Sequence, residues 1–242
     1  MHIIKLNATD STNSYLRKLC NATFVDDFTV VTTKKQTQGR GQMGTVWDSE
    51  ASKNLTFSVF KDLSEVYIEA PFYISMVTAL SLIKAIESFG IPRLSIKWPN
   101  DILSADKKIC GVLIENVIKQ AHFKASIIGI GLNVNQTLFK NLPRASSLKI
   151  ISGREFDLDE LTMAIISNLK TYFNLLSIER NSIKAEYEKY LFRKNKPSTF
   201  KDAEGNMFSG FIKSVSNSGH LQVMLEDNIL KRFDLKEITL LY

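Results

Sequence analysis

The chain has 242 residues, 44% of them hydrophobic and 23% charged, a composition that fits a globular protein with a buried core and excludes a disordered one. Its net charge of +6 is spread without a block of five or six basic residues, so nucleic-acid binding is permitted but not indicated. Cys20 and Cys110 lack metal-ligand spacing and no secretory segment follows Met1, which favours a reducing cytoplasm. No apolar run reaches the roughly 18 residues that a membrane span requires.

Hydrophobic periodicity predicts strands and helices in alternation along the first 190 residues. Asp10, Ser11 or Thr12 can cap the first helix, and Gly90 with Pro92 ends the second. The segment 54–60 alternates apolar and polar residues, which predicts a half-buried strand. Strands are predicted at residues 1–6, 28–33, 54–60, 95–98, 108–118 and 122–135, with a turn near Lys119 and Gln120, and helices at about 10–20, 70–89, 158–177 and 180–192.

The residue pattern of the sequence changes from about residue 195. Short period-2 segments alternate with the turn-rich stretches DAEGN, SNSG and EDN, a pattern typical of a small antiparallel barrel of about 45 residues. We therefore predict two domains, residues 1–193 and residues 194–242.

The stretch KKQTQGRGQMGTVW, residues 34–47, combines three glycines with basic side chains and ends on Trp47. Glycine lets backbone N–H groups approach an anion closely, and the guanidinium of Arg40 suits phosphate or carboxylate. Such a loop should be mobile when empty and able to close over a ligand. The alternative is an ordinary surface loop or hairpin tip.

Three further segments carry candidate site residues. In IKWPND, residues 96–101, Pro99 fixes a turn where a strand ends, so that Asn100 and Asp101 project from it. In KKICGVLIE, residues 107–115, Lys108 heads a buried strand and Gly111 leaves a gap where a ligand can approach. The alternatives are an ordinary exposed turn and a solvated lysine beside a core strand.

The segment IGIGLNVN, residues 128–135, places Gly129 and Gly131 inside a predicted strand. Glycine in a strand costs roughly 0.5–1 kcal/mol relative to alanine. Two together indicate that something flat lies against the strand, or alternatively that a helix packs tightly on it.

Together, DSTN, QTQGRGQMGTVW, KWPNDI, KKICGVLIE and IGIGLNVN resemble the biotin protein ligase family in order and spacing, from about residue 5 to residue 136. The resemblance implies an α+β fold: a mixed sheet flanked by helices, related to class II tRNA synthetases, with a C-terminal SH3-like β-barrel. Some members carry an N-terminal helix-turn-helix. This chain starts on the first strand of the core, so we expect a monofunctional ligase without a DNA-binding module.

The implied reaction joins biotin and ATP to biotinyl-5′-AMP and then transfers biotin to a lysine of a carrier protein, such as an acetyl-CoA carboxylase subunit. By resemblance, Lys108 and Arg40 are catalytic. Magnesium would arrive with ATP, with Asp101 as a candidate contact. The biotin contacts would be Ser11, Thr12, Asn13, Gln36, Gly39, Arg40, Gly41, Gln42, Trp47, Lys108 and Gly111. The ATP or adenylate contacts would be Arg40, Lys97, Asn100, Asp101, Lys108, Gly131 and Asn133, the last facing adenine.

One position departs from the family pattern. Many members have an arginine where this chain has Gln42, so we expect weaker electrostatic retention of the adenylate. The three histidines, His2, His122 and His220, are interpreted as structural or solvated. The carrier protein, biotin and ATP are the expected partners, without DNA or a membrane, and a homodimer is left open. The rival interpretations are a lipoate or octanoate ligase of the related fold and a basic nucleic-acid-binding module.

Overall fold

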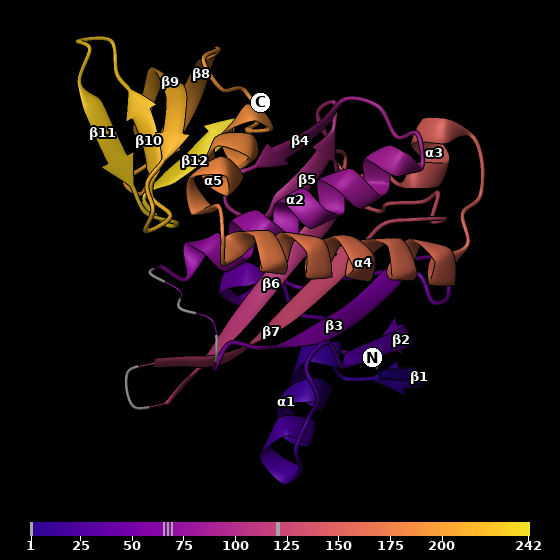
Figure 1. Cartoon of the computed structure of the whole chain (residues 1–242). Coiled ribbons are helices and arrows are strands. Elements are labelled where there is room, and N and C mark those ends of the chain that lie inside the picture. Colours follow the sequence, from indigo (N-terminus) through magenta and orange to yellow (C-terminus); the bar gives the residue numbers. More distant parts are fainter. Residues whose placement is uncertain (1, 65, 67, 69, 120–121) are drawn as a thin grey trace.

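The computed structural model describes residues 2–64, 66, 68, 70–119 and 122–242 (Figure 1). Its first part holds strands β1 (Ile3–Thr9), β2 (Val30–Gln36), β3 (Leu55–Asp62), β4 (Leu94–Lys97), β5 (Asp101–Ser104), β6 (Lys107–Lys119) and β7 (His122–Leu132). The helices are α1 (Thr12–Ala22), α2 (Phe72–Ser88), α3 (Leu148–Ser152), α4 (Leu158–Leu176) and α5 (Arg180–Lys189), with a 3₁₀ turn at Gln42–Gly44. The tail holds β8 (Pro197–Asp202), β9 (Met207–Val215), β10 (Leu221–Met224), β11 (Leu230–Phe233) and β12 (Ile238–Leu241).

Seven strands form one mixed sheet in the order β1-β2-β3-β7-β6-β5-β4. Strands β1 and β2 are parallel, and every other neighbouring pair is antiparallel. This arrangement confirms the predicted mixed sheet. It places the glycine-bearing strands β6 and β7 beside each other in the middle, with Gly111 directly opposite Gly131.

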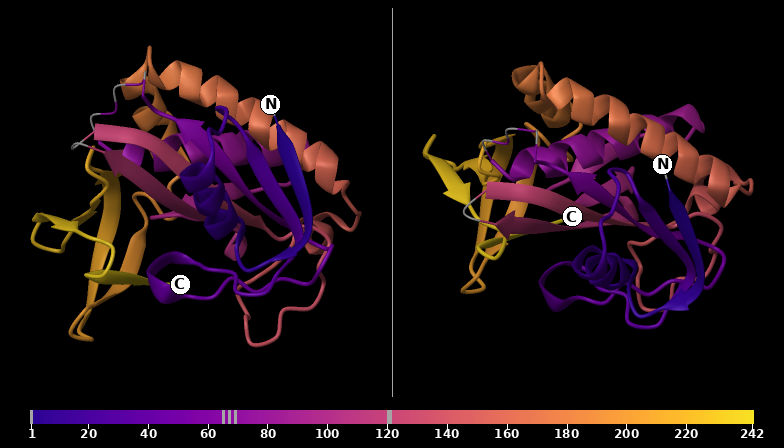
Figure 2. Two further views of the ribbon diagram at one scale, coloured as in Figure 1. Left: turned by 90° about the horizontal axis from the view of Figure 1, so that it is seen from below. Right: turned by 60° about the horizontal axis from the view of Figure 1, so that its bottom comes forward.

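Helices cover both faces of the sheet. The long helices α2 and α4 pack on one face, where α2 contributes a row of buried residues to the main core. Helix α1 lies on the opposite face against β2, β3 and β7, over a smaller cluster that includes Leu16 and Ile127 (Figure 2). None of the helices in the described part of the chain combines the length and apolarity needed to cross a membrane.

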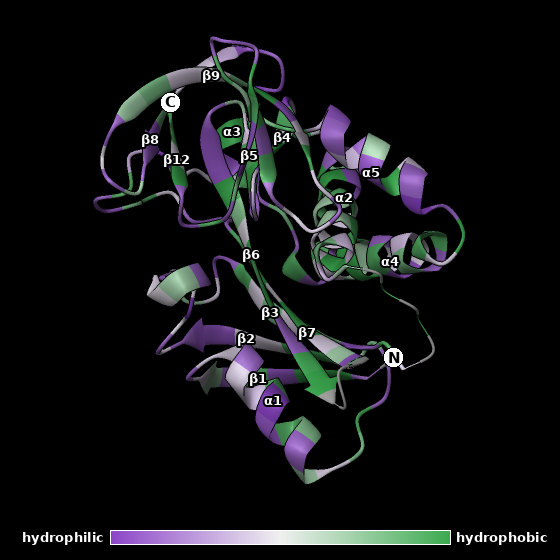
Figure 3. Cartoon of the chain, turned by 90° about the vertical axis from the view of Figure 1, so that its left-hand side faces the viewer, coloured by the Kyte–Doolittle hydropathy of each residue, from purple (hydrophilic) through white to green (hydrophobic). Residues whose placement is uncertain are grey.

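Strand β3 is buried on both faces, so the prediction of a half-buried strand was wrong. Thr56 and Ser58 are as inaccessible as the apolar residues Leu55, Phe57 and Val59 that alternate with them. The cause is α1, which covers the side of β3 that the alternation assigned to solvent. In Figure 3 much of β2 carries the polar colour, and α5 shows both colours. Buried polar groups of this kind require hydrogen-bond partners, which the site supplies.

Two elements escaped prediction from the sequence. Strand β5 folds back on β4 through the Trp98–Pro99 turn, so that Lys97 lies opposite Asp101. Helix α3 is a single turn capped by Ser147, which accepts a hydrogen bond from the Ile150 N–H. Of the predicted turn near Lys119 and Gln120, residues 120 and 121 lie outside the described residues.

The tail forms a five-stranded antiparallel sheet in the order β11-β10-β9-β8-β12, as the SH3-like pattern predicted. Within the described residues β11 and β12 are its edges, so the strand pairing does not form a closed ring. Among the contacts that join it to the rest of the chain, Trp98 Nε1 donates to Gly219 O at 2.8 Å, and Val215 N donates to Glu188 Oε1 at 3.2 Å. The tail therefore packs beside the β4–β5 turn.

Candidate active site

A cavity of about 360 Å³ lies between the start of α1, the loop after β2 and the central strands β6 and β7. Most of the sequence-predicted site residues meet on its walls: Ser11, Thr12, Asn13, Gln36, Arg40, Gly41, Gln42, Trp47, Asn100, Asp101, Lys108, Gly111 and Gly131. Gly39, Lys97 and Asn133 lie outside its lining. The lining residues that the sequence analysis did not assign to the site are Met43, Thr45, Val46, Thr56, Val112, Leu113, Gly129 and Ile130.

The inner end of the cavity is a buried polar network at the N-terminus of α1. Gln36 Oε1 accepts from the Thr12 N–H at 2.9 Å and from its hydroxyl at 3.2 Å. Ser58 Oγ donates to Asn13 Oδ1 at 2.6 Å and lies 2.7 Å from Thr12 Oγ1. These contacts hold the side chains in fixed orientations, because a buried polar group that loses its partner costs about 1–3 kcal/mol.

The glycines of β6 and β7 make room for two neighbouring side chains. A Cβ added at Gly129 would lie 2.4 Å from Asn13 Oδ1, and one at Gly131 would lie 2.3 Å from the Trp47 ring. A Cβ at Gly111 would also press on that ring, at 3.0 Å. Both interpretations of the glycine pair thus apply: a helix residue packs against Gly129, and a flat indole lies on Gly131.

The glycine-spaced loop is a narrow hairpin. Its backbone is tied by Trp47 N to Gly39 O at 3.0 Å and by Gly41 N to Thr45 O at 2.7 Å. A side chain at position 39 would collide with Trp47 O, at 2.1 Å, so Gly39 is required by close backbone approach. The hairpin folds Trp47 back into the cavity, where its buried Nε1–H has no partner among the described residues. A hydrogen-bond donor is therefore available there to a ligand.

Arg40 faces a carboxylate that the sequence analysis did not single out. Its Nη2 lies 3.3 Å from Glu115 Oε2. The same carboxylate accepts from Asn13 Nδ2 at 2.9 Å and pairs with Arg17 at 3.3 Å. Glu115 thus links the loop to α1. The alternation along β6 could have indicated it, since Gly111, Leu113 and Glu115 share one face.

At the outer end, two lysines share one carboxylate. Lys108 Nζ lies 2.6 Å from Asp101 Oδ1, and Lys97 Nζ lies 3.8 Å from Asp101 Oδ2. Lys108 Nζ is also 5.7 Å from the centre of the Trp47 ring, so it points into the space roofed by the loop. Burial lowers the pKa of Lys97; Asp101 acts against this, while the neighbouring Lys108 adds to it. The outer end is therefore electropositive.

The two predicted asparagines act differently. Asn100 lines the cavity while its Nδ2 donates to Val112 O at 2.7 Å. Asn133 is 5% exposed, and its Nδ2 donates to Ser146 O at 3.0 Å. In this structure Asn133 therefore holds the loop after β7 and does not reach the cavity wall.

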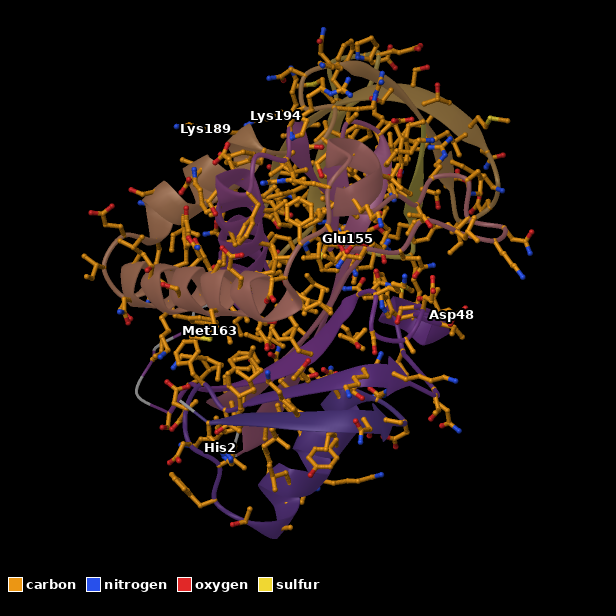
Figure 4. The ribbon with its side chains drawn as sticks, turned by 90° about the vertical axis from the view of Figure 1, so that its right-hand side faces the viewer. His2, Asp48, Glu155, Met163, Lys189 and Lys194 are labelled. Atoms are coloured by element: carbon orange, nitrogen blue, oxygen red, sulfur yellow. The ribbon has the colours of Figure 1, made fainter. Side chains whose placement is uncertain are left out.

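None of the described histidine side chains lines the cavity. Figure 4 shows His2 at the β1 end of the molecule, apart from Asp48, which follows Trp47 at the end of the glycine-spaced loop. His220 Nδ1 lies 2.8 Å from Ser218 Oγ in a turn of the tail. The side chain of His122 lies outside the described residues.

The described residues contain no cluster of three or more His, Cys, Asp or Glu side chains that would hold a metal. Among the described residues that line the cavity, Asp101 is the one carboxylate, and Lys108 already pairs with it. A magnesium ion here would therefore take most of its ligands from a bound polyphosphate and water.

Residues 6–133, which include the start of α1, the loop and both glycine strands, match the biotin/lipoate A/B protein ligase family. The chain belongs to this family. Among curated relatives, a bifunctional ligase/repressor BirA of Bacillus spizizenii is 32% identical over 64% of the chain, and a biotin–[acetyl-CoA-carboxylase] ligase of Paracoccus denitrificans is 34% identical over 53% of it. The chain spans about half the length of both relatives, 49% and 53%.

The structural comparison extends over the whole fold. The biotin protein ligase of Aquifex aeolicus, solved in complex with biotin and ATP, superimposes with a TM-score of 0.83 at 26% identity, covering 99% of this chain and 98% of that one. The similarity includes the tail sheet as well as the seven-stranded sheet. The family and the predicted fold class are thereby confirmed.

Proposed function

We propose that this protein is an ATP-dependent ligase that attaches biotin to a lysine of a carrier protein through biotinyl-5′-AMP. The observation that carries the proposal is one cavity with a buried, neutral, hydrogen-bonding end and a cationic end that holds Lys108. Biotin has the same two-ended character, with a ureido head and a carboxylate tail. The relatives named as biotin ligases support the choice of substrate.

The buried end suits the ureido ring, which offers two N–H donors and one carbonyl acceptor. Thr12, Asn13 and Gln36 supply amide and hydroxyl groups there, with Ser11 beside them. The indole of Trp47 forms an apolar wall beside the gap at Gly111 and Gly131. Gly41 and Gln42 border the same space from the hairpin. These contacts would orient the biotin carboxylate toward Lys108.

The first step needs charge stabilisation rather than a protein nucleophile. A biotin carboxylate oxygen attacks the α-phosphorus of ATP, and the bond to pyrophosphate breaks. Lys108, placed by the β5–β6 pairing, would neutralise charge on the carboxylate and α-phosphate, and Arg40 would contact the phosphate from the hairpin. Asn100 and Asp101 would border the nucleotide, and Asp101 would hold Lys108 in its orientation. Magnesium would enter with ATP and neutralise phosphate charge.

In the second step the lysine amine of the carrier attacks the acyl carbon, and AMP leaves with its bonding electrons. The hairpin carrying Arg40 would shield the anhydride from water until then. The carrier would be the biotin-carrying protein of an acyl-CoA carboxylase, and the reaction would take place in the cytoplasm. We further propose that residues 1–193 perform the chemistry and that residues 194–242 are a separate unit that supports it.

The test is transfer of labelled biotin to an apo carrier domain in the presence of ATP and Mg²⁺. Incorporation should depend on both substrates and should be blocked by unlabelled biotin but not by lipoate. If lipoate competed as well as biotin, the protein would be assigned to the lipoate ligases of the family. No incorporation by a folded protein that also makes no adenylate would refute the proposal.

A further inference from the structure

Beyond the cavity wall, the side chain of Tyr242 reaches from the tail to the cationic end. Its ring centre is 4.0 Å from the Arg144 guanidinium carbon and 5.3 Å from Lys97 Nζ. Phe192 meets the ring edge-on, with centroids 5.0 Å apart. Aromatic faces attract cations at such distances. One tail residue is thus in contact with two cations of the first part of the chain.

Arg144 is tied to Lys108 through the backbone. Lys108 N donates to Arg144 O at 2.7 Å, and Ser146 N donates to Lys108 O at 2.9 Å. Residues 144–146 therefore run alongside the start of β6, and the backbone of Arg144 lies next to that of Lys108. Arg144 is exposed, which leaves its guanidinium accessible to an incoming anion.

The charges in this corner are unbalanced. Lys97 and Lys108 both lie against the carboxylate of Asp101, and Arg144 is close enough to act on Lys97, so three cations face the two carboxylates of Asp101 and Asp106 that act on Tyr242. Burial is the main cause of the lowered pKa of Lys97, and the nearby cations Lys108 and Arg144 lower it further. A multivalent anion would relieve the repulsion among the three cations, and Arg144 offers the planar fork that suits phosphate oxygens.

We propose that Arg144 and Lys97 bind the β- and γ-phosphates of ATP and that Tyr242 is the positioning residue that holds them for this task. The proposal rests on the proposed function, because it places the phosphates beyond Lys108, on the side from which pyrophosphate leaves. It also gives the tail a direct part in nucleotide binding. The aromatic ring offsets part of the repulsion between the two cations while no anion is bound.

Four variants test the assignment: Tyr242→Leu, Tyr242→Phe, Arg144→Gln and the control Phe211→Leu. Phe211 is a tail residue whose ring lies 5.8 Å from Lys213 Nζ, so the control removes a comparable cation–aromatic contact away from the cavity. The readouts are the KM for ATP, the Kd for biotin without nucleotide and the melting temperature. If the Tyr242 ring served only the stability of the fold, Tyr242→Leu would change only the melting temperature.

The KM for ATP should rise about fivefold in Tyr242→Leu and about tenfold in Arg144→Gln, the range expected for losing a partly exposed cation–aromatic contact and a charged hydrogen bond. The Kd for biotin should stay unchanged, and the control Phe211→Leu should remain near wild type. Tyr242→Phe keeps the ring and should therefore restore most of the ATP affinity that Tyr242→Leu loses. An unchanged KM for ATP in Tyr242→Leu, with or without a lower melting temperature, would overturn the proposal. So would an equal loss of biotin binding.

Inorganic pyrophosphate separates this proposal from the proposed function, because its binding requires no chemistry. Calorimetric titration should show pyrophosphate binding to wild type and about fivefold weaker binding to Tyr242→Leu. That result combined with no biotin-dependent turnover would refute only the ligase activity. Normal turnover with equal pyrophosphate affinity in both proteins would refute only the role of Tyr242.

Discussion

The two ends of the cavity are built on opposite principles. At the inner end Thr12, Asn13 and Ser58 are almost fully buried, and each has a hydrogen-bond partner within the protein. At the outer end Lys108 and Lys97 keep 34% and 26% of their side chains exposed and share one carboxylate. The inner end is satisfied without a ligand, whereas the outer end has excess positive charge.

This difference shows what each end of the cavity contributes to substrate binding and to the rate of reaction. A fixed network of neutral groups selects shape and hydrogen-bond pattern, because its members cannot reorient to suit another molecule. Uncompensated cations contribute mainly where negative charge develops, which is the requirement for transferring an acyl group to a phosphate. Substitutions at the inner end should therefore change biotin affinity, and those at the outer end should change the rate.

The largest effect is expected for Lys108→Ala. Removing one preorganised cation should slow adenylate formation about 10²–10³-fold, the typical cost of losing such a group. Biotin affinity should change far less, because the inner end stays intact. Pyrophosphate release under saturating substrates measures the rate of adenylate formation. Fluorescence or calorimetric titration measures the biotin affinity.

Lys124→Ala is the matched control, since Lys124 is an exposed lysine of the neighbouring strand β7 outside the cavity. It should behave as wild type. Near-wild-type pyrophosphate release in a folded Lys108→Ala protein would remove Lys108 from the chemistry and with it the distinction between the two ends.

The next effect is expected for Ser58→Ala at the inner end. Loss of its hydroxyl leaves Asn13 Oδ1 without this donor, so unfolding should require about 1–3 kcal/mol less. Biotin affinity should fall about tenfold, as expected when one hydrogen-bonding side chain is freed to reorient. Urea denaturation and biotin titration measure the two quantities, and the rate at saturating biotin should stay near wild type.

Ser126→Ala provides the comparison, because Ser126 is a fully buried serine of β7 that donates to Asn116 Oδ1 at 2.6 Å. It should lose similar stability and keep full biotin affinity. If both variants bound biotin equally well, the network around Ser58 would be a feature of packing alone.

The smallest effect is expected for Gln42→Arg. Gln42 borders the cavity, so an arginine there adds one cation to the hairpin and should slow dissociation of the adenylate about two- to fivefold, a typical size for an exposed charge interaction. The release of labelled biotinyl-5′-AMP over time measures this dissociation rate. Gln38→Arg adds the same charge outside the lining and should change nothing. No slowing in Gln42→Arg would show that charge at this position does not retain the intermediate.

The sequence predicted the order of the main elements because helix and strand periods are local properties. It failed where tertiary contacts decide: the polar face of β3 is buried only because α1 covers it. Strand β5 follows too closely on Pro99 for a period-2 pattern to show, since it has four residues. Helix α3 is equally short, with five residues.

The candidate site was predictable where a residue type is unusual for its element. Glycines within β6 and β7 and a tryptophan ending a polar loop marked positions that now meet, with Gly131 against Trp47. Ser58, Glu115, Arg144 and Tyr242 are ordinary residues for their local pattern. Their importance depends on neighbours far away in the chain, such as the contact between Arg144 and Tyr242, which only the folded structure reveals.

The most direct measurement is the amount of biotinyl-5′-AMP formed in a single turnover with biotin, ATP and Mg²⁺ and without carrier protein. If the cavity joins a biotin-binding end to a cationic phosphate-binding end, wild type should accumulate close to one equivalent of adenylate per active site, and Lys108→Ala should form almost none in the same time. A folded wild-type protein that binds both substrates and forms no adenylate would contradict the proposed chemistry of this site.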